Sequence, residues 1–185
     1  MVEDITCNFI GDFKVGDNMV AAARALCRLN TQNEGGIFNK LMVIQVGSIV
    51  EAALDQIIYR AQSYVREGVP NIDEDELEAI RSTKIERFNN IIQAMRARGL
   101  LDGLEADIYD ELDRLRQLRN RIHIQFDDKP AQIGRDDADA FTEDTVNWAL
   151  GFCITLLTFL RDEYPRPRQL SVFAHDISIP RPSER

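Results

Sequence analysis

Apolar side chains recur along most of this chain at the three- and four-residue spacing that puts them on one face of an α-helix. The longest stretch is residues 37–66, where the predicted apolar face carries Ile37, Leu41, Ile44, Ile49, Ala53, Ile57 and Ala61. Gly68 and Pro70 follow this stretch and are expected to end it. The pattern therefore predicts one long helix in the first half of the protein.

Shorter helices are predicted on both sides of it. Asp17 or Asn18 is expected to cap a helix that runs to residue 30. The same spacing predicts helices over residues 84–98, 104–124 and 139–163, and one or two helical turns in the acidic connector NIDEDELEAI. The helix over residues 139–163 is apolar nearly all round, which predicts a place at the centre of a bundle or at a subunit contact.

These elements predict the fold class and the domain organisation. Short connections between long amphipathic helices favour an all-α fold, an up-and-down helical bundle of about five helices over residues 18–163. We expect residues 1–17 to be irregular and residues 164–185 to form an extended tail bracketed by prolines. Within that tail, residues 170–179 are expected either to add a strand or to dock in an extended form.

Composition narrows the classes of protein. No apolar run reaches the ~18 residues that cross a bilayer, and the N-terminal residues do not resemble a secretory signal, so we expect a cytoplasmic protein without membrane contact. Three widely spaced cysteines favour reduced thiols and predict neither a disulfide framework nor a metal site. The sequence has no glycine-rich phosphate loop, nucleophile elbow or paired-carboxylate metal signature, which argues against kinases, ATPases and hydrolases. We also expect no cofactor.

The net charge of −9 argues against a protein that coats nucleic acid through phosphate neutralisation alone. Basic residues nevertheless cluster locally. One group is Arg114, Arg116, Arg119 and Arg121, and a second, around another predicted helix, is Arg81, Lys84, Arg87, Arg96 and Arg98. This distribution is compatible with a basic cleft on an acidic body.

The first basic group contains the most informative pattern in the chain. Arg116, Arg119, Asn120 and His123 are separated by spacings of three, four and seven, so a helix would carry them in one stripe. An imidazole titrates near neutral pH, and two fixed guanidiniums beside it would suit it to proton transfer next to an anion. Glu51, in an otherwise uncharged stretch, either neutralises one of these arginines or marks the exposed edge of its helix.

This segment, LDRLRQLRNRIHI, resembles the HEPN superfamily of helical bundles, whose signature is an arginine, usually followed by a small polar residue, and then a histidine after four to six further residues. The order of the predicted helices over residues 18–163 is also similar. In this chain only three residues separate Arg119 from His123, whereas six separate Arg116 from His123, but Gln117 then follows that arginine. Which arginine takes the family role is left open.

The resemblance implies a metal-independent RNA endonuclease of the toxin or phage-defence type, with His123, Arg119 and Arg116 as catalytic residues and Asn120 and Glu51 in supporting roles. It also implies a homodimer in which two motif helices face each other across a cleft, and a partner protein such as an antitoxin or another defence component. The alternative is a non-catalytic HEPN-like module that binds a partner or a nucleotide. In that case the polar stripe is structural.

Overall fold

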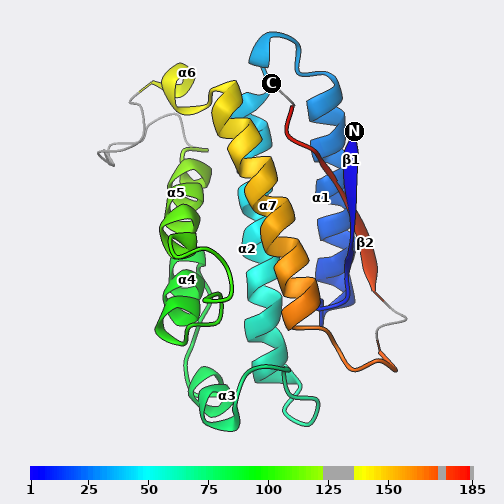
Figure 1. The fold of residues 1–185 in the computed structure, drawn as a ribbon, viewed down its shortest axis with the longest axis vertical. Helices are drawn as coiled ribbons and strands as arrows, with labels where there is room; N and C mark the ends of the chain where they lie inside the picture. Colours follow the sequence, from blue (N-terminus) through cyan, green and yellow to red (C-terminus); the bar gives the residue numbers. More distant parts are fainter. Residues whose placement is uncertain (123–135, 171–173, 184–185) are drawn as a thin grey trace.

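The long apolar stretch forms helix α2 (Asn39–Ser63), and the rest of the protein packs around it. The computed structural model describes residues 1–122, 136–170 and 174–183. Helices α1 (Phe13–Thr31), α5 (Ile108–Asn120) and α7 (Glu143–Glu163) lie along α2, as Figure 1 shows. By length and composition alone α2 could cross a membrane, but most of it is buried inside the protein, so packing in the core accounts for its apolar sequence.

Shorter elements complete the helical part. Helix α3 (Glu74–Arg81) lies in the acidic connector, as predicted, and the Asp73 side chain caps it by accepting a hydrogen bond from the backbone N–H of Glu76. Helix α4 (Phe88–Ala97) matches the helix predicted over residues 84–98, and Gly99 follows it with a positive φ of 62°. A 3₁₀ turn, η1 (Glu34–Gly36), joins α1 to α2, and α6 (Asp137–Ala140) precedes α7.

Several predicted helix boundaries were wrong. Helix α1 begins earlier than expected, because Asp12 and not Asp17 or Asn18 caps it, accepting from the N–H groups of Lys14 and Val15. The helix predicted over residues 139–163 is divided, because Thr142 adopts an extended conformation and caps α7. The chain before α7 therefore forms the separate turn α6.

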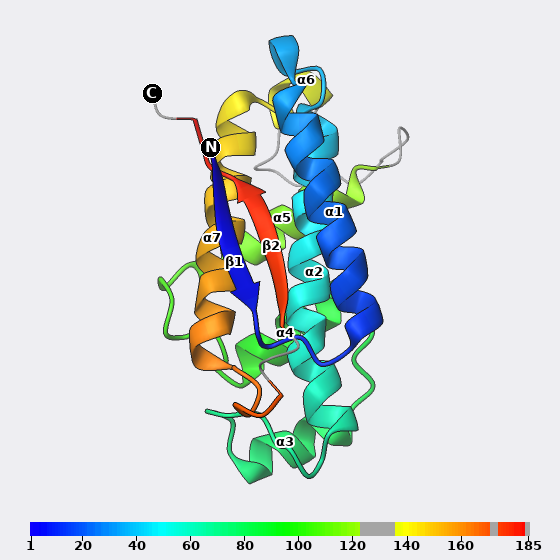
Figure 2. The ribbon, with the colours of Figure 1, turned by 90° about the vertical axis from the view of Figure 1, so that its right-hand side faces the viewer.

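The protein is mostly helical, as predicted, but it also has a small antiparallel sheet and is therefore not all-α. Strands β1 (Val2–Cys7) and β2 (His175–Pro180) pair with Ile5 opposite Ile177, so the prediction that residues 1–17 are irregular was wrong. Of the two alternatives for residues 170–179, the structure shows the added strand, over residues 175–180. Figure 2 shows both strands lying across α7 and α1, where the alternate residues Ile5, Cys7, Ile177 and Ile179 are buried. The sheet is thus one face of the core.

His175, at the start of β2, is largely covered and not an exposed tail residue. Its side chain is 13% exposed and its Nε2 lies 3.3 Å from a carboxylate oxygen of Asp17. The ring fits against α1 only because residue 16 is glycine, since a Cβ at Gly16 would overlap the imidazole. This histidine therefore helps to dock the C-terminal strand on α1.

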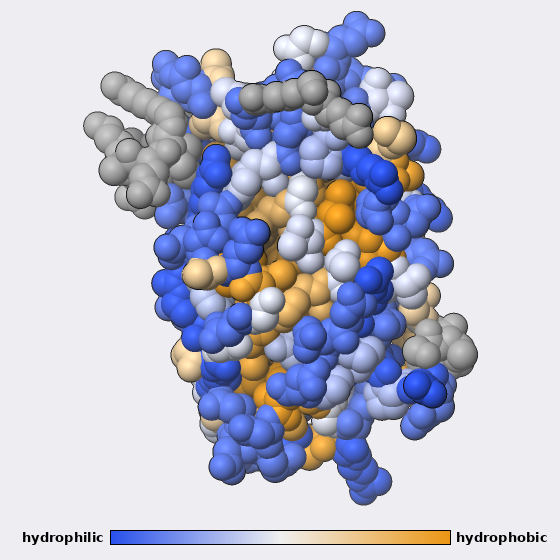
Figure 3. All heavy atoms as spheres, viewed as in Figure 1, coloured by the Kyte–Doolittle hydropathy of each residue, from blue (hydrophilic) through white to orange (hydrophobic). Residues whose placement is uncertain are grey.

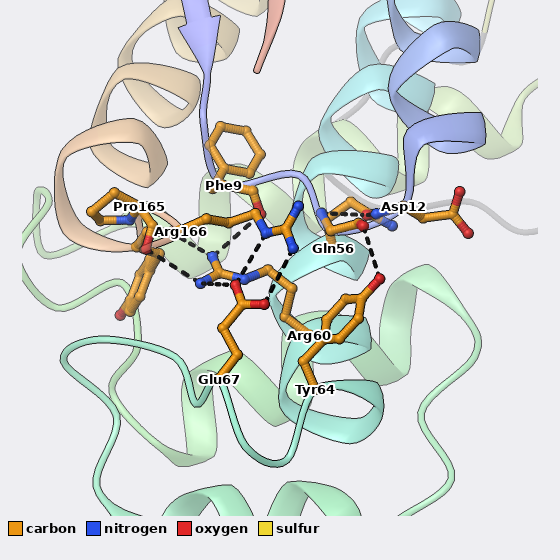
Figure 4. Close-up of polar contacts among 10 residues, drawn as sticks. Phe9, Asp12, Gln56, Arg60, Tyr64, Glu67, Pro165 and Arg166 are labelled. Atoms are coloured by element: carbon orange, nitrogen blue, oxygen red, sulfur yellow. Dashed lines mark hydrogen bonds and ion pairs between the residues drawn. The ribbon is translucent and has the colours of Figure 1, made fainter. Parts of the chain in front are cut away.

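A buried arginine ties the ends of three elements together (Figure 4). Arg60, on the last turns of α2, has no exposed surface and donates hydrogen bonds to the carbonyl oxygens of Phe9, Tyr164 and Pro165. Glu67 lies 3.9 Å from Arg60 and accepts two hydrogen bonds from Arg166, at 3.0 and 3.2 Å. Burial lowers the pKa of Arg60 to about 10, so the guanidinium is still charged at neutral pH. This cluster joins the segment after β1 to the C-terminal end of α7.

Candidate functional site

Helix α5 carries three of the four residues in the predicted stripe. Arg116, Arg119 and Asn120 lie on its last turns, as expected. The helix ends at Asn120, and the next N–H, that of Arg121, bonds to the Leu118 carbonyl in a tighter turn, so the prediction that the helix continues through residues 121 and 122 was wrong. His123 lies outside the described residues. The structure therefore defines the arginine–asparagine part of the proposed site.

Of the two alternatives left open for Glu51, the structure shows the pairing with a motif arginine. Arg119 Nη2 donates to Glu51 Oε2 at 2.5 Å, and Arg119 Nη1 lies 3.4 Å from the side-chain oxygen of Asn120. The side chains of Arg119 and Glu51 are 35% and 21% exposed, so the pair is at the surface and accessible to solvent. Glu51 comes from α2, and it therefore fixes Arg119 from across the interface between α2 and α5.

A glycine permits this arrangement. Gly47 lies one turn before Glu51 on α2, and a Cβ at Gly47 would lie 2.8 Å from Arg119 Cβ and 3.0 Å from its Cγ. The stem of Arg119 thus rests directly on the backbone of α2. No larger residue fits at Gly47 without moving α5 or the arginine.

Arg116 is held on its own helix. Its Nε donates to one carboxylate oxygen of Asp113 at 3.1 Å, while Arg96 on α4 donates to the other at 3.3 Å. The Asp113 side chain is 23% exposed, so this bridge is half-buried and less screened than a fully exposed pair. Asp113 therefore positions Arg116 and joins α5 to α4.

The two arginines line a hollow of about 270 Å³, which we call the arginine pocket. Its lining consists of Glu51, Glu86, Arg87, Phe88, Asn89, Arg116, Arg119 and Asn120. Three guanidiniums thus face two carboxylates. Helix α4 also begins here, with no side-chain cap at Arg87 and no acidic residue in its first turn, although Glu86 comes directly before Arg87. The three guanidiniums and the start of this helix are groups that can bind an anion.

The sequence pattern did not predict that Arg87 and the start of α4 line the same pocket as Arg116 and Arg119. The signal was present, since Arg87 lies in the second basic group, but residues far apart in the sequence meet only through the fold. The other two arginines of the first basic group point elsewhere. Arg114 stacks over the ring of Trp148 at 3.9 Å, and Arg121 is buried at 9% exposure beside Phe141. Arg121 is therefore not part of the arginine pocket, although it belongs to the same basic group in the sequence.

Comparison of the chain with models of protein families, with curated proteins and with solved structures found no match. Function is therefore inferred from the motif in the sequence and from the arginine pocket at the end of the motif helix.

Proposed function

We propose that this protein is a metal-independent RNA endonuclease of the HEPN kind and that the arginine pocket binds the phosphodiester that is cut. The observation that carries the proposal is that Arg116, Arg119 and Asn120 share an open pocket with Arg87 and the start of α4. Without the pocket, the motif would be a short pattern on one helix.

The pocket has donors left for a phosphate. Arginine carries five N–H donors, and Glu51 and Asn120 engage only the two terminal nitrogens of Arg119. Among the described residues, Arg87 takes part in no ion pair, and its side chain is exposed at the rim. Forked N–H groups held in advance bind a phosphate in a defined orientation and stabilise the charge that grows on it during reaction.

In the proposed reaction His123 is the general base. It removes the proton from a ribose 2′-hydroxyl, and the resulting oxygen attacks the adjacent phosphorus and displaces the 5′-oxygen of the next nucleotide. The displaced 5′-oxygen takes a proton from solvent, so the products are a 2′,3′-cyclic phosphate and a 5′-hydroxyl, and His123 releases the proton that it took. DNA is not cut, because it lacks the 2′-hydroxyl that serves as nucleophile.

The test is incubation of the pure protein with RNA in the presence of EDTA. Cleavage should fall by about 10²–10⁴-fold in His123→Ala and by about 10²–10³-fold in Arg119→Ala. His175→Ala is the matched control, because His175 is the only other histidine and lies on β2. RNA that stays intact with the wild-type protein, or equal cleavage by His123→Ala, would refute the proposal.

A second candidate function is favoured by the ion pairs themselves. Arg119 is paired with Glu51, and Arg116 with Asp113, within one chain, as a purely structural polar cluster would be. The corresponding function is a non-catalytic helical module that binds a nucleotide or a protein partner at the same pocket. Calorimetric titration with mono- and dinucleotides tests it, and Arg87→Ala should then weaken binding without any RNA being cut.

The main proposal also includes a partner protein and a second copy of this chain. The net charge of −9 weakens binding to bulk nucleic acid. We therefore propose either that the target is one structured RNA, or that a partner protein covers the arginine pocket and keeps the enzyme inactive until that partner dissociates. The protein is further proposed to act as a homodimer in the cytoplasm.

A further inference from the structure

The outward face of α7 contains an apolar groove that no other part of the described chain fills. The hollow measures about 360 Å³, and its apolar lining includes Leu104, Ile108, Trp148 and Phe152. Trp148 and Phe152 stack on each other with ring centroids 5.9 Å apart. Figure 3 shows apolar surface gathered in the middle of this face with hydrophilic atoms on both sides. We call this surface the α7 groove.

Charge is distributed unevenly along the groove. At one end Arg114 lies over Trp148, at 3.9 Å from the ring centroid. Glu111 lies 3.9 Å from Arg114 in a loose pair that leaves the arginine side chain 44% exposed. Glu105 and Asp107 line the same hollow, but they precede Arg114 by at least two helical turns, about 10 Å along α5 and the turn before it. Neither of these two acids takes part in an ion pair among the described residues. Glu111 also accepts a hydrogen bond from Trp148 Nε1, so the groove has an arginine paired with a glutamate at one end and two further acids at the other.

Different residues of α7 lie at the two ends of the groove. Trp148 lies at the Arg114 end, whereas Phe159 lies at the other end, where it packs against Gly103 so closely that a Cβ there would lie 2.9 Å from its ring. Thr155, exposed on the same face, lines the groove between Phe152 and Phe159. The Arg114–Glu111 pair, the apolar floor and the two further acids therefore follow one another along the helix.

We propose that the α7 groove joins two copies of this chain across a two-fold axis that passes near Phe152. Two α7 helices would cross in opposite directions, so Trp148 of one copy would face Thr155 of the other. The same operation would bring Arg114 of each copy to the partner's Glu105 and Asp107. A two-fold interface requires a patch that is complementary to itself, and this distribution of charge meets that requirement.

This contact differs from the shared cleft that the family resemblance implies. Arg114 and Arg116 are two residues apart, about 200° around α5, so the groove and the arginine pocket lie on nearly opposite sides of that helix. Dimerisation through the groove would leave each arginine pocket complete within its own chain. The inference goes beyond the proposed ribonuclease activity and does not depend on it, because association is measured without RNA.

The test is sedimentation velocity of the full chain at micromolar concentrations with charge-exchanged variants. The wild type should be a dimer. Arg114→Glu and Glu105→Arg should each raise the dimer dissociation constant about tenfold or more, because each sets like charges against each other twice. When the two variants are mixed, the glutamate introduced in one copy meets the arginine introduced in the other, and the second contact is wild type. The mixture should therefore form a heterodimer with an affinity near that of the wild type.

Thr155→Arg gives an independent measurement, because it places charge in the middle of the groove at an exposed position. Gln93→Arg on α4 is its control, since Gln93 is also exposed on a helix but lies outside the groove. Thr155→Arg should produce monomers with an unchanged circular dichroism spectrum, and Gln93→Arg should remain dimeric. A monomeric wild type, a dimer that tolerates Thr155→Arg, or a mixture no tighter than its two components would each overturn the proposal.

Discussion

Replacing Arg60 by methionine tests how the helical bundle is held to its terminal segments. Methionine keeps much of the apolar stem of the arginine but removes every donor. The carbonyl oxygens of Phe9, Tyr164 and Pro165 would lose hydrogen bonds of 3.2, 2.5 and 3.3 Å from a guanidinium with no exposed surface. The methionine side chain offers these carbonyls no donor in its place.

The expected loss follows from two opposing effects. A buried acceptor left without a donor costs about 1–3 kcal/mol, and three such losses in one cluster do not add fully. Removing a buried guanidinium also removes the cost of keeping it out of water. Glu67 is not left alone, because Arg166 still donates to both its oxygens. We therefore expect a loss of about 3 kcal/mol in the free energy of unfolding, or a fall of about 6–12 °C in Tm.

The assay is urea denaturation at neutral pH, followed by circular dichroism. Arg161→Met is the matched control, because the Arg161 side chain is 36% exposed. Among the described residues, its ion pair is with the adjacent Asp162. Its effect should stay within about 0.5 kcal/mol. If Arg60→Met were as stable as Arg161→Met, the cluster would not stabilise the fold and the reasoning would be wrong.

Three further predictions concern packing, pH and thiol reactivity. Gly47→Ala should destabilise the protein by about 1–3 kcal/mol in the same assay, because the new Cβ would meet Arg119 at 2.8 Å, whereas Gly151→Ala, with its nearest contact at 3.5 Å, should be neutral or stabilising. Burial raises the pKa of the Tyr164 hydroxyl to about 12, so this group loses its proton at a lower pH in the unfolded chain than in the folded protein. The free energy of unfolding should therefore fall as the pH rises from about 10 towards 12. Urea midpoints measured across that range should fall less steeply for Tyr164→Phe than for the wild type. Of the three cysteines, only Cys27 is not buried, so a thiol reagent should label one site in the folded protein and all three in urea; rapid labelling of more than one native thiol would contradict the burial.

The helices of this protein could be predicted from the sequence because helix formation depends on neighbours three and four residues away. The apolar spacing that identified α4 is the spacing by which that helix is buried. On α2 the predicted face was right from Ile44 onward but wrong at its start, because Ile37 and Leu41 are 70% and 50% exposed. The same local rule failed at β1, and for β2 it left open whether the segment adds a strand or docks in an extended form, since each strand is six residues long and its backbone partner lies more than 160 residues away. Pairing over that distance leaves no local pattern stronger than a short alternation of apolar residues.

Some features of the candidate site also follow from local spacing, whereas others depend on how the helices pack. That Arg116, Arg119 and Asn120 share one side of a helix follows from their spacing alone, and so does the pairing of Arg116 with Asp113 one turn away. Only the tertiary structure determines that Glu51 forms the ion pair with Arg119 and that the stem of Arg119 packs on Gly47. It also determines that α4 begins at the same pocket. It also selected Arg60 as the buried arginine, which its sequence neighbours do not reveal. Spacing determines which side chains share a face of a helix, whereas the partner that neutralises a charge is set by which helices pack together.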